Sequence, residues 1–122
     1  MEKEPEIRYE EGYAVTKEIE VRLECGICGR PAAAITKECN KYDNDIIINA
    51  SQCEEEKCLI QDYKRNMIEL LGLGAERGKK LDVMVENIPG THPERILKRL
   101  YSGLTSEDFY PDFDRFGENL KK

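Results

Sequence analysis

Four of the five cysteines in this 122-residue chain lie in two close pairs, and no other pattern in the sequence points so directly to chemistry. Two residues separate Cys25 from Cys28, four separate Cys53 from Cys58, and 24 residues lie between the pairs. Four thiolates at tetrahedral reach are a common cage for a structural zinc ion. We therefore predict a Zn²⁺ site whose ligands are Cys25, Cys28, Cys53 and Cys58, with Cys39 as a candidate additional ligand.

The residues around the first pair resemble a zinc knuckle. The run is Cys25-Gly-Ile-Cys28-Gly29-Arg30-Pro31, in which the glycine after the second cysteine lets the backbone turn back with a positive φ. A knuckle, a hairpin and a helix that donates the second pair are the layout of treble-clef zinc fingers, which residues 21–72 resemble. The second pair departs from the usual two-residue gap, because residues 53 and 58 lie about 140° apart on an ideal helix. The resemblance implies a zinc-stabilised binding or regulatory protein in which zinc is structural.

A second resemblance uses all five cysteines. Their order, a pair with a two-residue gap, a lone Cys39 and a pair with a four-residue gap, is similar to that of the delta iron–sulfur subunits of methyl-viologen-reducing hydrogenases. The apolar run Asn44-Asp-Ile-Ile-Ile-Asn49 precedes the last pair, as in that family. This chain is shorter between the pairs by about one strand–helix unit. The resemblance implies a small α/β layer with a [2Fe–2S] cluster, acting as an electron-transfer subunit of a larger redox enzyme.

Other roles for these residues have less support in the sequence. The thiols could be buried without a metal, and a Cys25/Cys28 redox pair would need a thioredoxin-like setting that the pattern does not suggest. His92 is the only histidine, and we expect it to be exposed and structural, just before Pro93. No Ser/His/Asp or Cys/His arrangement can be assembled without it, so the sequence leans against an enzyme.

The elements that would position the first cysteine pair are a strand and an ambiguous segment. From Tyr13 to Cys25 apolar and charged residues alternate, which predicts a half-buried strand. Residues 32–39 fit either a short helix that begins at Pro31 or a strand. We favour the strand, because residues 40–45 are rich in turn formers and Ile46-Ile47-Ile48 could return as its hairpin partner.

The second half of the chain predicts a helix, a strand and another helix. Ser51 and Glu54 form a capping box before an apolar stripe at helical spacing, and Gly72 and Gly74 end it. Residues 81–85 alternate as a strand, and Thr91 caps a further helix. The apolar stripe of this last helix consists of Ile96, Leu97, Leu100, Tyr101 and Leu104.

These elements predict an α+β fold, a small zinc-stapled domain with a β-hairpin and knuckle followed by helix, strand and helix. We expect a flexible acidic N-terminus over residues 1–12, a single metal-binding domain over residues 13–104, and an acidic-aromatic tail over residues 105–122. The tail holds Phe109, Tyr110, Phe113 and Phe116 among acidic residues, so it either folds back over the core or docks on a partner.

Composition and charge limit the classes of partner that the chain is expected to bind. Charged residues make up 36% of the chain and the net charge is −6, which argues against strong non-specific nucleic-acid binding and favours a protein partner. No apolar run approaches the length of a membrane span, and the first residues lack the features of a signal peptide, so we expect a cytoplasmic protein. A local basic face for a partner could still form from Lys64, Arg65, Lys79, Lys80, Arg95, Lys98 and Arg99.

Overall fold

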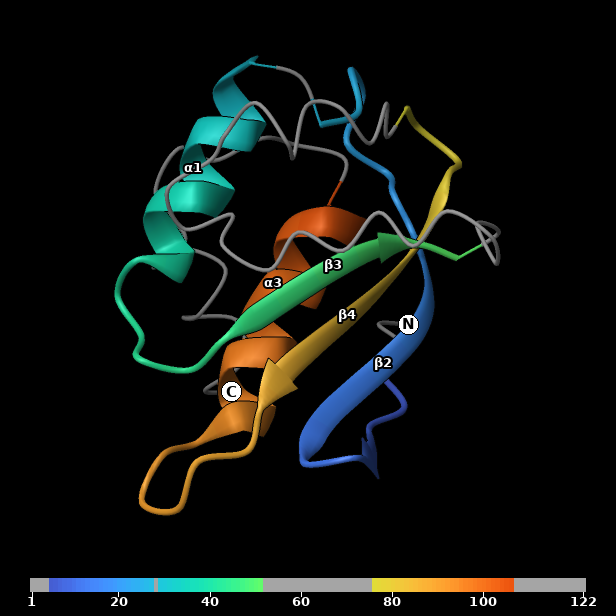
Figure 1. Ribbon diagram of the computed structural model, residues 1–122. Coiled ribbons are helices and arrows are strands. Elements are labelled where there is room, and N and C mark those ends of the chain that lie inside the picture. Colours follow the sequence, from blue (N-terminus) through green and yellow to red (C-terminus); the bar gives the residue numbers. More distant parts are fainter. Residues whose placement is uncertain (1–4, 28, 52–75, 107–122) are drawn as a thin grey trace.

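The computed structural model describes residues 5–27, 29–51 and 76–106. In chain order the elements are β1 (Arg8–Glu10), β2 (Tyr13–Glu20), α1 (Gly29–Cys39), β3 (Ile46–Ala50), β4 (Lys80–Glu86) and α3 (Pro93–Thr105). The four strands form one sheet, and α1 and α3 lie together on one side of it (Figure 1). The described part of the chain is therefore an α+β layer with two helices over one sheet face.

The sheet is antiparallel and has the strand order β1-β2-β4-β3. The central strand β4 pairs with β2 on one side and with β3 on the other. The register of β2 shifts between Thr16 and Ile19, where Glu18 has a φ of 55°. The N–H of Glu18 donates to Asp82 Oδ1 at 2.9 Å, so a side chain on β4 satisfies a donor at the irregularity.

The core lies between this sheet and the two helices. Alternate strand residues point toward the helices, as the two-residue period of a strand requires. On α3 the buried residues recur at helical spacing, with Leu97, Leu100 and Leu104 fully buried. The strand residues of the core are Ala14, Ile19, Ile46, Ile48, Ala50, Leu81, Val83 and Val85.

The prediction of a hairpin over residues 32–48 is wrong, because Gly29–Cys39 is the helix α1. Ala32, Ile35 and Cys39 are buried, and their spacing of three and four residues matches one helix face. Pro31 lies in the first turn, where its missing N–H costs no helical hydrogen bond. Strand β3 pairs with β4, so the partner of Ile46–Ile48 comes from much later in the chain.

The four other strand and helix predictions in the described residues are confirmed, with two errors of detail. Strands β2, β3 and β4 and helix α3 form where the periodicity predicts them, except that β2 ends at Glu20 rather than at Cys25. The residue before α3 is His92 rather than Thr91, and it makes no side-chain capping bond. Thr91 instead donates its hydroxyl to the Ile88 carbonyl at 2.6 Å and accepts from Asn44 Nδ2 at 2.9 Å. The predicted helix after Ser51 and the tail from residue 107 lie outside the described residues.

Residues 8–10, inside the segment predicted to be a flexible N-terminus, form strand β1. β1 pairs with β2 and so adds a short outer strand to that side of the sheet. Tyr9 is 54% exposed and donates its hydroxyl to Glu94 Oε1 on α3 at 2.6 Å. The domain boundaries given above remain predictions.

Two glycines with open surroundings offer a matched stability test. An added Cβ would meet nothing within 4 Å at Gly90 or at Gly29, but Gly90 has a φ of 86°. We expect Gly90→Ala to lower the free energy of unfolding by about 1–2 kcal/mol, because an L side chain is strained there. We expect Gly29→Ala to raise it by about 0.5 kcal/mol, since alanine has fewer unfolded conformations. Urea unfolding measures the free energy of unfolding of both variants. Equal changes would contradict the inference that an L side chain is strained at residue 90.

Candidate functional site

The structure describes two of the five cysteines, and they lie in different surroundings. Cys25 is exposed in the turn between β2 and α1, and Cys39 is fully buried at the end of α1. Cys28, Cys53 and Cys58 lie outside the described residues. Among the residues that are described, no three His, Cys, Asp or Glu side chains come together as metal ligands. The described residues therefore do not test the four-cysteine ligand set as a whole.

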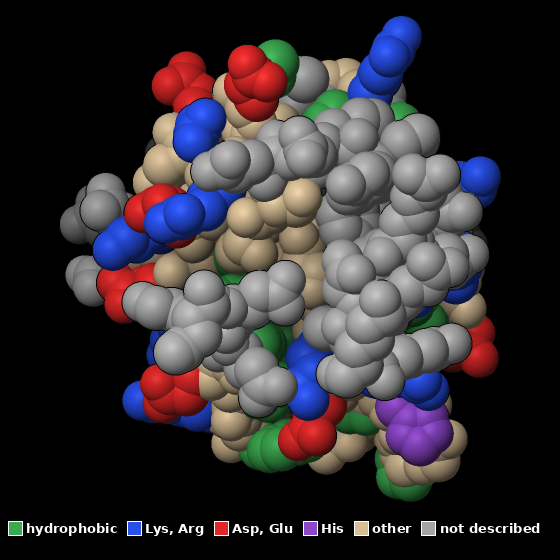
Figure 2. All heavy atoms as spheres, turned by 180° about the vertical axis from the view of Figure 1, so that it is seen from behind, with side chains coloured by type: hydrophobic (Ala, Val, Ile, Leu, Met, Phe, Trp, Pro, Cys, Tyr) green, Lys and Arg blue, Asp and Glu red, His purple; other side chains and the backbone are tan. Residues whose placement is uncertain are grey.

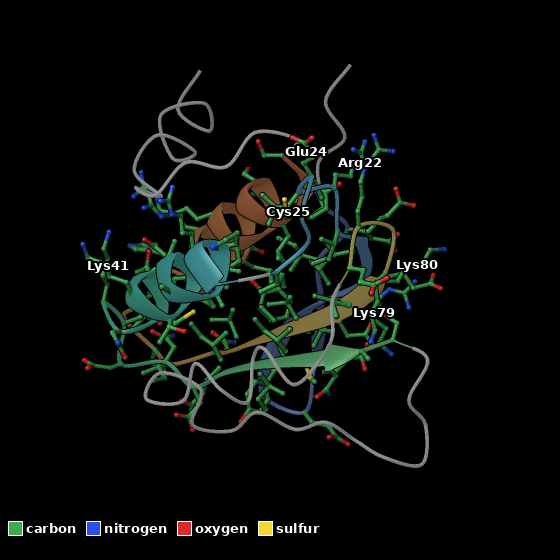
Figure 3. All side chains as sticks on the ribbon, turned by 90° about the horizontal axis from the view of Figure 1, so that it is seen from above. Arg22, Glu24, Cys25, Lys41, Lys79 and Lys80 are labelled. Atoms are coloured by element: carbon green, nitrogen blue, oxygen red, sulfur yellow. The ribbon has the colours of Figure 1, made fainter. Side chains whose placement is uncertain are left out.

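The turn that carries Cys25 is held at both ends. Gly26 has a φ of 67°, and its N–H donates to the Leu23 carbonyl at 2.9 Å. Leu23 and Ile27, on either side of the turn, are 3% and 5% exposed. The Arg22 N–H donates to the Leu104 carbonyl at 2.9 Å, which ties the start of the turn to the last turn of α3. Cys25 therefore projects from a fixed bend beside the end of α3 (Figure 3).

The start of α1 lies directly after this turn and suits an anion. The first N–H groups of a helix have no intrahelical acceptors and carry a partial positive charge. The first turn of α1 contains no acidic residue, and it contains the exposed guanidinium of Arg30. Cys28 precedes Gly29, the first residue of the helix, in the chain. Backbone donors, a guanidinium and a thiol are thus adjacent along a short stretch of sequence.

The only histidine lies at the other end of the molecule. α1 begins at the end of the molecule where α3 finishes, whereas His92 precedes the start of α3 (Figure 1). His92 is exposed, and it is the single purple side chain at the bottom of Figure 2. The first turn of α3 carries the exposed carboxylate of Glu94, which would repel an anion there. The electrostatic surroundings therefore favour the start of α1 over His92 as an anion site.

A buried ionic cluster joins the second half of α1 to α3. The Glu38 side chain is 1% exposed, and Arg99 donates to its two oxygens at 2.8 and 3.2 Å. Lys41 Nζ lies 3.1 Å from Glu38 Oε1, and the Tyr42 hydroxyl donates to Glu38 Oε2. Burial raises the pKa of Glu38, but the hydrogen bonds from Arg99, Tyr42 and Lys41 outweigh it, so the pKa lies below its ordinary value.

The lowered pKa predicts how Glu38 contributes to stability as a function of pH. A carboxyl group whose pKa is lower in the folded state stabilises the protein above its ordinary pKa of 4.5, and this stabilisation is lost as the pH falls through the lowered value. We expect Glu38→Gln to lower the free energy of unfolding by about 1–2 kcal/mol at neutral pH. We also expect the free energy of unfolding of the variant to fall less steeply as the pH is lowered. Urea unfolding over a pH series tests this, with the exposed Glu24→Gln as the control. An unchanged acid slope would contradict the assignment.

The predicted basic face is divided between distant parts of the structure. Lys80 begins β4 and Lys79 precedes it, whereas Arg95 lies in the first turn of α3, and the two elements begin at opposite ends of the molecule (Figure 1). Arg99 belongs to the cluster with Glu38. Lys64 and Arg65 lie outside the described residues, and Lys98 is half-buried on α3. Figure 2, which views the molecule from behind, shows acidic and basic side chains mixed over the visible face.

Comparison with known proteins identifies the fold. A family model described as the PTS HPr component phosphorylation site matches residues 15–100, which is more than half of the chain. The chain belongs to the HPr family. A similar solved structure is that of the phosphocarrier protein HPr from Bacillus anthracis, with a TM-score of 0.55 and 22% identity, covering 71% of this chain and 93% of the other. None of the curated proteins compared with the chain matches it.

Membership in the HPr family corrects the interpretation of the cysteines. The sheet with α1 and α3 is an HPr-like α+β fold and not a treble-clef finger, a zinc-stapled domain or the delta subunit of a hydrogenase. The structural zinc and the alternative [2Fe–2S] cluster were wrong for the same reason, and so were the functions derived from them. In the run interpreted as a knuckle, Cys25 lies in the turn before α1, and Gly29, Arg30 and Pro31 are the first residues of α1.

The expectation of a protein partner is supported, since HPr-family proteins act with other proteins of the phosphotransferase system. None of the helices in the described part of the chain is both long and apolar enough to cross a membrane. Sequence reasoning missed the start of α1 as a candidate anion site, although Arg30, Pro31 and the absence of acidic residues there were visible signals. It also missed the Glu38–Arg99 pair, for which no signal was available without the helices.

Proposed function

We propose that this chain is a phosphocarrier protein of the phosphotransferase system, and that the thiol of Cys28 accepts the phosphoryl group. The observation that carries the proposal is the match of residues 15–100 to the HPr phosphorylation-site family. The start of α1 supports it, because backbone N–H groups and Arg30 can stabilise phosphate oxygens there. Cys28 lies outside the described residues, so its role rests on its position in the chain, next to Gly29.

The transfer is a pair of substitutions at phosphorus. The Cys28 thiolate attacks the phosphorus of a phosphorylated donor protein, an S–P bond forms, and the bond from phosphorus to the donor's side chain breaks. An acceptor nucleophile then attacks the same phosphorus, the S–P bond breaks, and the thiolate is restored. The positive end of α1 favours the thiolate before transfer and the phosphate oxygens after it. No further reactant is required.

Cys28 is a better candidate than the other nucleophiles of the chain. Cys39 is fully buried, so a donor protein cannot reach it. His92 is exposed, but it precedes a helix whose first turn carries the exposed carboxylate of Glu94. Cys25 is exposed, but three residues separate it from the helix, so it is further along the chain from the backbone donors. Only Cys28 is adjacent to the first residues of α1 in the chain.

The proposal includes the partners and the compartment. Enzyme I and enzyme II of the phosphotransferase system are proteins with which HPr interacts, and we assign them as donor and acceptor here. Both exchanges take place in the cytoplasm under this proposal. The exposed start of α1, with Arg30, is the surface that both partners would contact.

Acceptance of a phosphoryl group from phosphorylated enzyme I tests the function. We expect the intact mass of the chain to increase by one phosphoryl group, and the increase to be lost when unphosphorylated enzyme II is added. The exposed Arg95→Met, at the other end of the molecule, should behave like the unchanged chain. If the chain binds enzyme I but never gains the phosphoryl mass, then it is a binding module and the proposed carrier function is wrong.

A further inference from the structure

We draw no further inference here: the strongest candidate, the apolar row of Val15, Met84 and Ile47 on the sheet face turned away from α1 and α3, carries no proposal because nothing in the described part of the structure shows what covers it.

Discussion

Cys28→Ser is expected to reduce phosphoryl acceptance from enzyme I by about 100-fold or more. A cysteine is partly ionised and strongly nucleophilic at neutral pH, whereas a serine hydroxyl needs an adjacent general base. In the described residues His92 is at the opposite end of the fold from the start of α1, so it cannot act as that base (Figure 1). The measurement is the initial rate of phosphoryl gain, followed by intact mass.

Two other cysteines provide matched controls for that loss. Cys25→Ser and Cys39→Ala should keep the rate within a few-fold of the unchanged chain, because neither thiol is the acceptor. Far-ultraviolet circular dichroism shows whether each variant is folded. If Cys28→Ser is folded and retains the full rate, the assignment of Cys28 is wrong.

Arg99→Met is expected to lower the free energy of unfolding by about 3 kcal/mol, near the lower end of the range for breaking a buried ion pair. The change leaves the Glu38 carboxylate, which is 1% exposed, without its two guanidinium donors. Lys41 and Tyr42 remain as partners and limit the loss. Methionine keeps the length of the side chain, so the effect reports mainly the lost charge. Urea unfolding at neutral pH measures it.

The exposed Arg95 on the same helix is the matched control for this prediction. Arg95→Met should change the free energy of unfolding by no more than about 0.5 kcal/mol. Adding Glu38→Gln to Arg99→Met should recover part of the loss, because a neutral amide is less costly to bury than an unpaired carboxylate. Equal effects of the two arginine changes would mean that Glu38 does not depend on Arg99.

Periodicity was sufficient to predict most of the described elements. The alternation in β2 and β4 and the helical spacing of Ile96, Leu97 and Leu100 in α3 are local signals, and the structure confirms all three. Strand pairing was not predictable in the same way. β3 was assigned to a neighbouring segment because hairpins are local, whereas its partner β4 begins at Lys80. Local patterns do not determine which distant strands pair.

Helix α1 was missed because its sequence supports two structures equally well. Three alanines and Pro31 allow a helix start, but the turn formers in residues 40–45 equally suggest a hairpin. The helix buries Ile35 and Cys39 against the core, and this tertiary contact decides between the two. The zinc prediction came from the spacing of the cysteine pairs, and the hairpin in place of α1 supported the resemblance to a treble-clef finger.

Only part of the candidate site could be predicted from the sequence. Cys25, Cys28 and Arg30 were visible as an unusual cluster, but their chemistry depends on whether a helix begins at Gly29. Nothing in the sequence singles out Glu38, since acidic side chains are seldom buried unless they are paired. Its partner Arg99 comes 61 residues later and had been assigned to a basic surface. The fold was needed to bring the two charges together.

The position of the phosphoryl group is the most direct test of the account. After transfer from enzyme I, the chain is digested with trypsin at neutral pH, and the mass of each peptide is measured. We expect the added phosphoryl mass on the peptide of residues 23–37, which contains Cys28 at the start of α1. Phosphoryl mass on the peptide of residues 81–95, which contains His92, would contradict the central claim.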